Sequence, residues 1–387
     1  MKLSLQIIFF GIVLSIYGLI NYYIYKRALP FIPLNYKFFF TISFLIVVVS
    51  FIAGRFLERV SINLFSDVLI WVGSFWLAFM FYFFLALVLI DLLRLINLII
   101  PFFPAFITHN IEKTKNIVAL SVLILVVITV FGGYINTKTI ITKTYKITAH
   151  KNLGELKTLN IAMASDLHLG TLNGKSYLNK LVTDINKLNP DIILLVGDII
   201  DEDLASVIKY NVGEELVKLK SKYGIYTVTG NHEYIGGVEE AVKYLSEHGV
   251  NVLRDTFIKI DNSFYLAGRE DRAIKQFAGK RRKELKDILN GVDKSNPIIL
   301  MDHQPFGLKD AKENEVDLQL SGHTHNGQLW PINYIVSKIY ELSWGYLVDG
   351  STHYYVSCGV GGWGPPVRTG SRPEIINIKL SCGDYKK

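Results

Sequence analysis

Long apolar runs dominate the first third of the 387-residue chain. An α-helix needs about 17–25 residues of this kind to cross a bilayer. Basic residues stand at the ends of the runs, and four such helices in succession would be unusual in a water-soluble core. We therefore expect residues 1–137 to form a transmembrane region of four helices, at about 3–25, 38–54, 68–90 and 117–135.

The number of spans bears on the orientation of the chain in the membrane. An even number places the amino terminus and the region after the last span on the same side. Lysine and arginine residues near the spans number seven on one side and six on the other, so their distribution does not select a side. Residues 91–100 could extend the third helix or lie in the interface as an amphipathic segment.

The pattern changes after residue 158, where short apolar runs rich in β-branched residues alternate with helical periodicity. This alternation is typical of a layered α/β domain, expected over residues 159–387. Residues 138–158, rich in Thr and Lys, would connect it to the membrane region, with room for one edge strand. The expected strands are 159–164, 192–196, 225–228, 264–267, 298–301, 318–320, 354–357 and 375–380, and the expected helices are 176–188, 204–219 and 238–247.

Potential metal ligands follow directly on several of these strands. In open α/β sheets the carboxyl ends of the strands form the ligand-binding edge, so these side chains should meet although they are far apart in sequence. Carboxylate, amide and imidazole groups suit a pair of divalent cations about 3.5–4 Å apart that share one carboxylate. The residues are Asp166 and His168, Asp198, Asn231 and His232, His303, and His323 and His325.

The individual motifs differ in how strongly each one indicates a metal site. Asp-x-His at 166–168 and Gly-Asp-x-x-Asp at 197–201 are each compatible with ordinary turn chemistry. Gly-Asn-His-Glu at 230–233 is stronger, because it puts two bulky polar side chains into a tight turn. Gly-His-Thr-His at 322–325 is strongest, because alternate residues of an extended segment would point both histidines to one site. Their occurrence together argues against a purely structural origin.

Composition and charge exclude few classes of binding partner. The formal net charge of +7 suits an anionic substrate or anionic lipid headgroups, and no Lys/Arg cluster marks a nucleic-acid face. The two cysteines, Cys358 and Cys382, do not stand at a metal-ligand spacing. Gly359-x-Gly361-x-x-Gly364 fits a dinucleotide fingerprint, but two prolines follow where a helix should begin. We expect a loop bordering the metal site, with Arg368 either contacting phosphate or simply solvated.

This set of motifs resembles the calcineurin-like metallophosphoesterase superfamily. Its signature is Asp-x-His, Gly-Asp-x-x-Asp, Gly-Asn-His-Asp/Glu, a separate His and Gly-His-x-His, and all five parts occur here in order over roughly residues 155–380. Ser-Asp-Leu-His-Leu-Gly at 165–170 and the Gly-rich segment after residue 358 are similar to the bacterial membrane-associated branch. The resemblance implies a layered β-sandwich flanked by helices. That branch includes phosphodiester hydrolases, among them enzymes acting on a nucleotide-activated diacylglucosamine.

The resemblance also implies roles for individual residues. Asp166, His168 and His325 would bind one metal, Asn231, His303 and His323 the other, and Asp198 would bridge them. A hydroxide bridging the metals would be the nucleophile, and His232 would donate a proton to the leaving group. Mn²⁺, Fe and Zn²⁺ all suit the donors. Asp201 and Glu233 would orient histidines or would be plain solvated carboxylates.

The sequence thus predicts a phosphoesterase with two metal ions, anchored as an integral protein in a bacterial cell membrane. A phosphodiester is the favoured substrate, and the anchor favours one that is lipid-linked or confined to the membrane surface. A phosphomonoesterase, a sensor or scaffold with a structural metal centre and lapsed hydrolysis, and a transporter formed by the spans are the alternatives. The expected partners are the lipid bilayer and the ester, with no nucleic acid and no cofactor beyond the metals.

Overall fold

The computed structural model describes residues 3–382 and, in the first helix, the side chains from Ile8 onward apart from Phe9. The chain divides into two compact units. A helical unit comprises Met1–Tyr134 with Gly364–Val367. The second unit comprises Ile135–Trp363 with Arg368–Lys387, and because it carries the side chains expected to bind metal, it is called the catalytic unit.

Helices follow one another closely in the helical unit. An Asn63 side chain accepts hydrogen bonds from the first turn of the long helix α3 and forms a capping box with Ser66. This helix continues to Ile99, so the stretch after residue 90 extends it and is not a separate interfacial segment. The helices are α1 (Leu3–Ala28), α2 (Lys37–Val60), α3 (Leu64–Ile99), α4 (Ala105–His109) and α5 (Ile111–Thr137).

Three helical segments are long and apolar enough to cross a membrane among the residues described, not the four expected: Leu34–Val60, Leu64–Ile99 and Ile111–Thr137. Helix α1 forms where the first span was expected but is not among these segments. Close packing joins α2 and α3. A Cβ at Gly54 would lie under 3.0 Å from Ile70, and one at Gly73 under 3.0 Å from Phe51. Small residues that let helix backbones approach are typical of membrane helix pairs.

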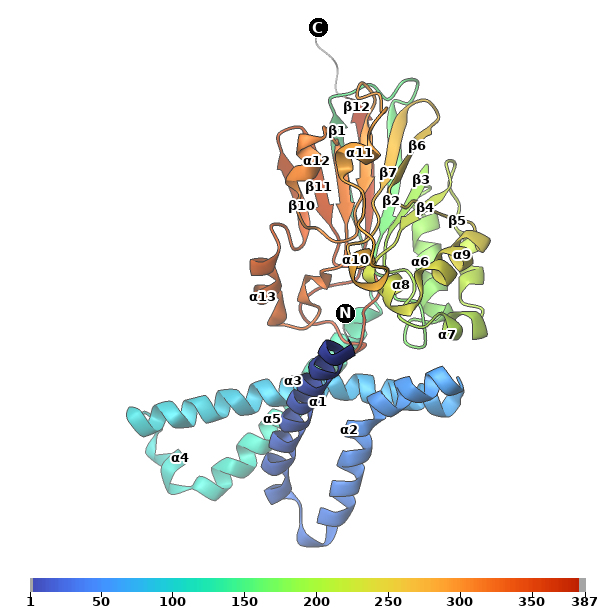
Figure 1. Ribbon diagram of the computed structural model, residues 1–387. Coiled ribbons are helices and arrows are strands. Elements are labelled where there is room, and N and C mark those ends of the chain that lie inside the picture. Colours follow the sequence, from blue (N-terminus) through green and yellow to red (C-terminus); the bar gives the residue numbers. More distant parts are fainter. Residues whose placement is uncertain (1–2, 383–387) are drawn as a thin grey trace. The chain divides into compact units, whose positions relative to one another are not determined.

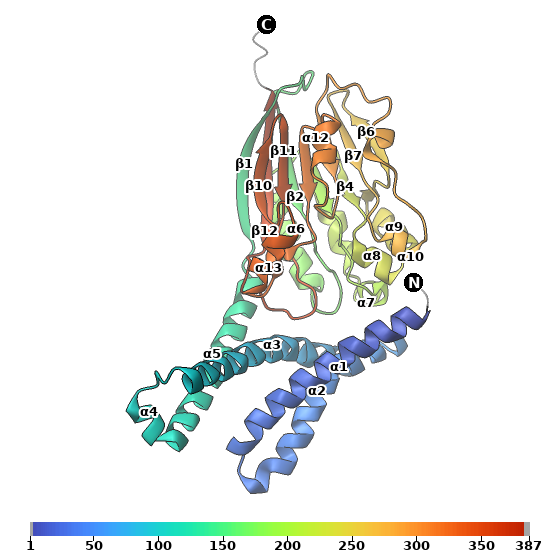
Figure 2. The same ribbon diagram turned by 60° about the vertical axis from the view of Figure 1, so that its left-hand side comes forward.

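The catalytic unit is built from two six-stranded sheets packed face to face, as Figures 1 and 2 show. The first sheet has the order β1-β12-β2-β3-β4-β5 and the second β10-β11-β9-β8-β7-β6. The strands are β1 (Ile141–Ala149), β2 (Thr158–Ala164), β3 (Ile192–Val196), β4 (Ile225–Val228), β5 (Val250–Val252), β6 (Thr256–Ile260), β7 (Phe264–Gly268), β8 (Ile298–Met301), β9 (Leu318–Ser321), β10 (Gly345–Asp349), β11 (Thr352–Val356) and β12 (Glu374–Cys382).

Apolar side chains fill the layers of this sandwich. The central cluster takes residues from both sheets, for example Ile161 and Leu194 from the first and Leu266 and Ile299 from the second. Helices α6 (Lys175–Asn186) and α9 (Val238–Glu247) pack on the outer side of the first sheet. Helices α11 (Leu285–Ile288) and α12 (Lys309–Glu313) cover the second. The layered β-sandwich flanked by helices is therefore confirmed.

Some local expectations need correction. The helix expected at 204–219 is broken into α7 (Leu204–Lys209) and a 3-10 turn at Gly213–Lys218, because Asn211 adopts φ 49°. Helix α6 begins at Lys175, one residue before the expected helix, and Gly174 stands at its N-cap. The stretch expected to connect the two regions contains β1, a nine-residue edge strand paired along its length with β12.

Strand direction brings the predicted ligands and the start of β1 to the same end of the catalytic unit. Strands β2, β3 and β4 run parallel, so their carboxyl ends share one edge. Strand β12 runs antiparallel to β2, and β1 runs parallel to β12. In this register Ile141 pairs with Glu374, and Ile376 pairs with Met163 near the end of β2. The chain therefore enters the catalytic unit at the edge where the predicted ligands lie.

Candidate metal centre

Five of the predicted ligands occupy backbone conformations that residues other than glycine rarely adopt. The φ angles are 54° at Asp166, 46° at His168, 51° at Asp198, 72° at His323 and 48° at His325. Each such residue costs of order 1–3 kcal/mol unless its surroundings enforce the conformation. Outliers concentrated at the ends of three buried strands point to a site whose geometry is maintained at the expense of stability.

The Gly-His-Thr-His segment differs from expectation. We expected an extended strand end that points both histidines the same way. The chain instead coils directly after β9, because His323 and His325 are left-handed and Thr324 between them is helical. The two histidines consequently join different groups of side chains.

The predicted ligands come together in two main groups. In the first, Asp166, His168 and His325 offer donor atoms that all lie within 4.8 Å of one another. The Nε2 atoms of His168 and His325 are 3.1 Å apart, and His325 Nε2 is 3.4 Å from Asp166 Oδ1. In the second group, Asp198, His303 and His323 meet the same limit.

Asp198 lies between these groups. Its Oδ2 atom is 3.0 Å from His303 Nε2 and 3.9 Å from His168 Nε2. One carboxylate oxygen therefore faces an imidazole of each group, and the carboxylate is 1 % exposed. This is the position that a ligand shared by two cations would require.

Asn231 and His232 begin helix α8 (Asn231–Gly236) instead of forming a tight turn. Glu233 explains the helix. Its carboxylate accepts hydrogen bonds from the backbone N–H groups of Gly230 at 2.7 Å, Asp198 at 3.1 Å, Ile199 at 2.7 Å and Ile200 at 3.0 Å. At 2 % exposure Glu233 is neither solvated nor bound to a histidine. It joins the Asp198 turn to the start of α8.

The glycines of the three motifs leave room for neighbouring ligands. A Cβ at Gly197 would lie under 3.0 Å from the His303 ring, one at Gly230 from Asp198, and one at Gly322 from Asp166. Each distance is shorter than real Cβ contacts allow. The glycine and ligand positions of the motifs are thus parts of a single packing arrangement.

Comparisons with known proteins agree with this arrangement. The profile of the calcineurin-like phosphoesterase family matches residues 159–327. An uncharacterized metallophosphoesterase of Campylobacter jejuni is 31% identical over 385 residues, covering 97% of this chain and 98% of that protein. The chain belongs to the calcineurin-like metallophosphoesterase family.

Two further relatives share a shorter region. An uncharacterized metallophosphoesterase of Helicobacter pylori is 35% identical over 58% of this chain and 60% of its own length. A transmembrane protein with metallophosphoesterase domain of Danio rerio is 35% identical over 58% of this chain and 54% of its own length. The chain therefore spans somewhat more than half the length of these two relatives. Together with the three apolar helices, the family makes this chain a membrane protein with a metal-dependent phosphoester hydrolase domain.

His232 lies against both acidic and imidazole groups of this metallophosphoesterase. Its backbone N–H donates to Asp198 Oδ1 at 2.9 Å, and its Nδ1 is 3.2 Å from Asp201 Oδ1. Its ring meets the His168 ring edge to face, with centroids 4.5 Å apart. Burial lowers the pKa of His232, but the negative charges of Asp198 and Asp201 outweigh this and raise that pKa to about 9. His232 also offers a ring nitrogen within 4.8 Å of donors on His168 and Asp198.

Asp201 takes the place expected of a residue that orients histidines. It is 8 % exposed and so is not a plain solvated carboxylate. Its Oδ1 lies 3.2 Å from His232 Nδ1 and 3.7 Å from His168 Nδ1. One carboxylate thus contacts two imidazoles of the centre.

The buried polar atoms fit a divalent cation. Asn231 Oδ1 is buried without a hydrogen-bond partner in the described part of the chain, which is costly unless a ligand uses its lone pairs. His303 Nε2 is buried against the Asp198 carboxylate, 3.0 Å away. His303 Nδ1 lies 2.8 Å from the carbonyl oxygen of Val196, a contact that directs Nε2 toward the centre. Burial raises the pKa of Cys358 to about 12, so it remains a thiol. The donors are therefore oxygen and imidazole, as Mn²⁺, Fe or Zn²⁺ would accept.

Burial and neighbouring charges shift the pKa values of the side chains at the centre. Burial raises the pKa of Asp166, whereas the positive charges of His303 and His232 overcome burial and hold the pKa of Asp198 well below its usual value. Burial and the charge of His303 lower the pKa of His323 to about 3. An ionised Asp198 and a neutral His323 are the forms that bind metals, whereas the raised pKa values of Asp166 and His303 mean that a cation bound by them would displace protons.

Arg368 is not the solvated arginine of the simpler interpretation. It is 1 % exposed, and its Nη2 lies 3.1 Å from His325 Nδ1. The guanidinium also donates to the Gly361 carbonyl and, at 3.2 Å, to Ser371 Oγ. Its place in a Gly- and Pro-rich loop after the last motif drew attention to it, but the sequence carries no sign of its contact with His325.

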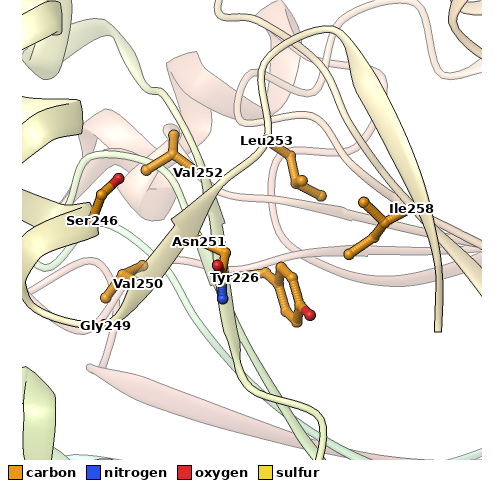
Figure 3. A pocket seen from close by; sticks show the side chains of 8 residues that line it. All are labelled: Tyr226, Ser246, Gly249, Val250, Asn251, Val252, Leu253 and Ile258. Carbon is orange, nitrogen blue, oxygen red and sulfur yellow. The ribbon is translucent and has the colours of Figure 1, made fainter. Parts of the chain in front are cut away.

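A hollow of about 530 Å³ lies elsewhere in the catalytic unit (Figure 3). It is lined by residues of β4, β5, β6 and the end of α9, including Tyr226, Ser246, Asn251 and Ile258. None of its lining residues belongs to the two groups of donors. The chemistry of the protein is therefore assigned to the strand ends and not to this hollow.

Proposed function

We propose that this chain is a membrane-anchored phosphodiesterase that uses two divalent cations on a lipid-linked or membrane-confined ester. The observation that carries the proposal is the position of Asp198 Oδ2, 3.0 Å from His303 Nε2 and 3.9 Å from His168 Nε2. A carboxylate placed between two imidazole groups is what a pair of cations with a common ligand needs.

Asp166, His168 and His325 would hold one cation. Asn231, His303 and His323 would hold the other, and Asp198 would contact both. Bound there, the cations would lower the pKa of water and neutralise charge on the phosphoryl oxygens. The positive-φ turns and the contacts of Glu233 keep these donors in place before any substrate arrives.

His232 would donate the proton that the leaving alkoxide requires. Asp201 holds its Nδ1 at 3.2 Å, which fixes the ring and leaves Nε2 for the substrate. The side chain is 7 % exposed and follows directly on the proposed ligand Asn231. General acid catalysis of this kind contributes about 10²–10⁴ in rate.

Charge at the centre favours a diester over a monoester. A monoester dianion needs more compensating positive charge than a diester, which carries one negative charge. Arg368 lies beside the donors, but its guanidinium is engaged by His325, Gly361 and Ser371 and does not compensate a second negative charge on a substrate. The membrane anchor keeps the site near lipid substrates.

The full chain in lipid nanodiscs, loaded with Mn²⁺, tests the proposal. Bis(4-nitrophenyl) phosphate should be hydrolysed faster than 4-nitrophenyl phosphate, and a chelator should stop both reactions. His232→Ala should lower kcat by about 10²-fold or more while bound metal, measured by mass spectrometry, stays unchanged. Full activity in that variant would refute the proton-donor role. Faster monoester hydrolysis would make the protein a monoesterase, and bound metal without hydrolysis would indicate a structural centre.

A further inference from the structure

Helix α13 (Ile332–Ile339) presents large apolar side chains to its surroundings. Tyr334 is 63 % exposed, Ile335 62 % and Ile339 59 %, and Trp330 just before the helix is 52 % exposed. The helix has no buried residue, although it packs on the turn at His325–Gly327. Monomeric soluble proteins rarely leave a contiguous surface of this kind uncovered.

This apolar surface borders the proposed metal centre. Only residues 326–331 separate α13 from His325. Beyond the helix, the Tyr340 ring lies 6.1 Å from the His323 ring and 4.6 Å from the Phe306 ring. A partner that covers α13 would therefore lie beside the strand ends that carry the ligands.

The surface also borders the point where the chain enters the catalytic unit. Trp330 N donates to Thr369 Oγ1 at 2.9 Å, and Thr369 N donates to Gln328 O at 3.0 Å. The residues on either side of Thr369 bind the end of helix α5, because Asn136 Nδ2 donates to the carbonyls of Arg368 and Ser371, both at 2.9 Å. One loop thus fixes both the start of α13 and the last turn of α5.

Helix α5 is one of the three candidate membrane spans and ends at Thr137, while β1 begins at Ile141. Thr137 and Ile141 can therefore be no further apart than about 13–14 Å, at about 3.3–3.6 Å per residue. A bilayer crossed by α5 must therefore lie close to the loop at 368–371. The chain itself supplies the surface that could cover α13.

We propose that α13 and Trp330 form a docking surface that lies in the interfacial region of the bilayer. Trp and Tyr prefer this depth, and Ile335 and Ile339, four residues apart on one face, would enter the acyl region. Lys338 on the same exposed helix can extend its ammonium group to the headgroups. The membrane is favoured over a second copy of the chain because the short tether holds this surface at the bilayer in every molecule.

Depth-dependent quenching in vesicles tests this docking. One cysteine at a time is introduced along α13 of the full chain carrying Cys382→Ser, in which the remaining Cys358 is buried. Each variant is labelled with an environment-sensitive fluorophore and reconstituted in phosphatidylcholine with phosphatidylglycerol. Doxyl-labelled lipids should quench the label on Ile335→Cys and Ile339→Cys at least twofold more than the label on Ser337→Cys. This periodicity is expected because Ser337 lies on another face of the helix.

Lys294→Cys is the matched control. Lys294 is partly exposed and precedes β8, whereas the proposed ligand His303 follows that strand, so the two lie at opposite ends of the sheet. In vesicles that contain doxyl-labelled lipids, the label on Lys294→Cys should lose no more fluorescence than it does in detergent without those lipids. Equal quenching at positions 294, 335 and 337 would overturn the proposal, as would a signal at 335 that rises with protein density in the membrane, which would indicate a second copy. Tyr334→Cys gives an independent reading if one variant fails to fold, and none of these readings requires hydrolysis.

Discussion

At the scale of single residues, Arg368 is the contact that sets this centre apart from a simple set of metal ligands. A metal-binding histidine usually donates its second ring nitrogen to a carboxylate or carbonyl. Here a guanidinium, which can only donate, lies 3.1 Å from His325 Nδ1. Burial, followed by the positive charges of His168 and Arg368, holds the pKa of His325 well below its usual value. Burial and the arginine together keep His325 neutral. Because Nδ1 accepts from the guanidinium, the ring proton lies on Nε2, the atom 3.4 Å from Asp166 Oδ1, and a cation bound at Nε2 would displace that proton.

Replacing this arginine should weaken metal binding without touching a proposed ligand. In Arg368→Met the Gly361 carbonyl and Ser371 Oγ lose the donor that fixes the loop beside His325, and we expect metal affinity to fall by about 10–100-fold, as for other groups that position ligands. Arg368→Lys keeps the charge but not the fork of donors and should fall between that variant and the parent. Metal titration by calorimetry measures the effect. An unchanged affinity in Arg368→Met would mean that the arginine only fills space.

At the scale of elements, burial decided which strands could be recognised in the sequence. Strands β3, β4 and β8 end where their apolar runs end, because nearly every side chain in them is buried. Strands β5, β6 and β10 were not expected. They are short strands with mixed burial, so their sequences carry neither a continuous apolar run nor a clear alternation.

The ligand set was recognisable for a related reason. Each motif follows a buried strand, and strand ends are edges that the fold must bring together. The coil at Gly322–His325 was not predictable, because a histidine gives no sign that it will adopt a positive φ. The helix at Asn231 was not predictable either, because Glu233 binds the backbone of a turn about 35 residues earlier in the chain, at 198–200. The neighbouring glycines were the available signal, and they reflect close contacts with ligands from other strands.

Two helix-capping glycines offer a matched test of that interpretation. Gly230 and Gly174 both stand at N-caps with negative φ, but a Cβ at Gly230 would collide with Asp198, whereas one at Gly174 would come only within 3.8 Å of Gly170 O. Gly230→Ala should lower the free energy of unfolding by about 1–3 kcal/mol and impair metal binding. Gly174→Ala should do neither. Thermal melts and metal analysis of both variants decide the matter, and equal effects would assign the glycine to helix capping alone.

At the scale of the whole molecule, the two units differ in what stabilises them. Every side chain in the two donor groups belongs to the catalytic unit, and all of them except the partly exposed His323 are buried. The helical unit instead contains the three apolar segments that could span a membrane.

Metal removal should therefore act on one unit and not on the other. A ligand that binds only the folded state at about a hundred times its dissociation constant stabilises that state by about 2.7 kcal/mol. For a domain of about 150–250 residues, each kcal/mol shifts the unfolding midpoint by about 2–4 °C. Chelation should thus lower the unfolding midpoint of the catalytic unit by about 5–10 °C and leave the helical transition in place.

Calorimetry of the full chain in nanodiscs measures both transitions, with Asp198→Ala as the control whose midpoint should no longer respond to chelator. If the metal-loaded protein melts at the same temperature with and without chelator, the buried donors are satisfied by one another and the centre is not a metal site.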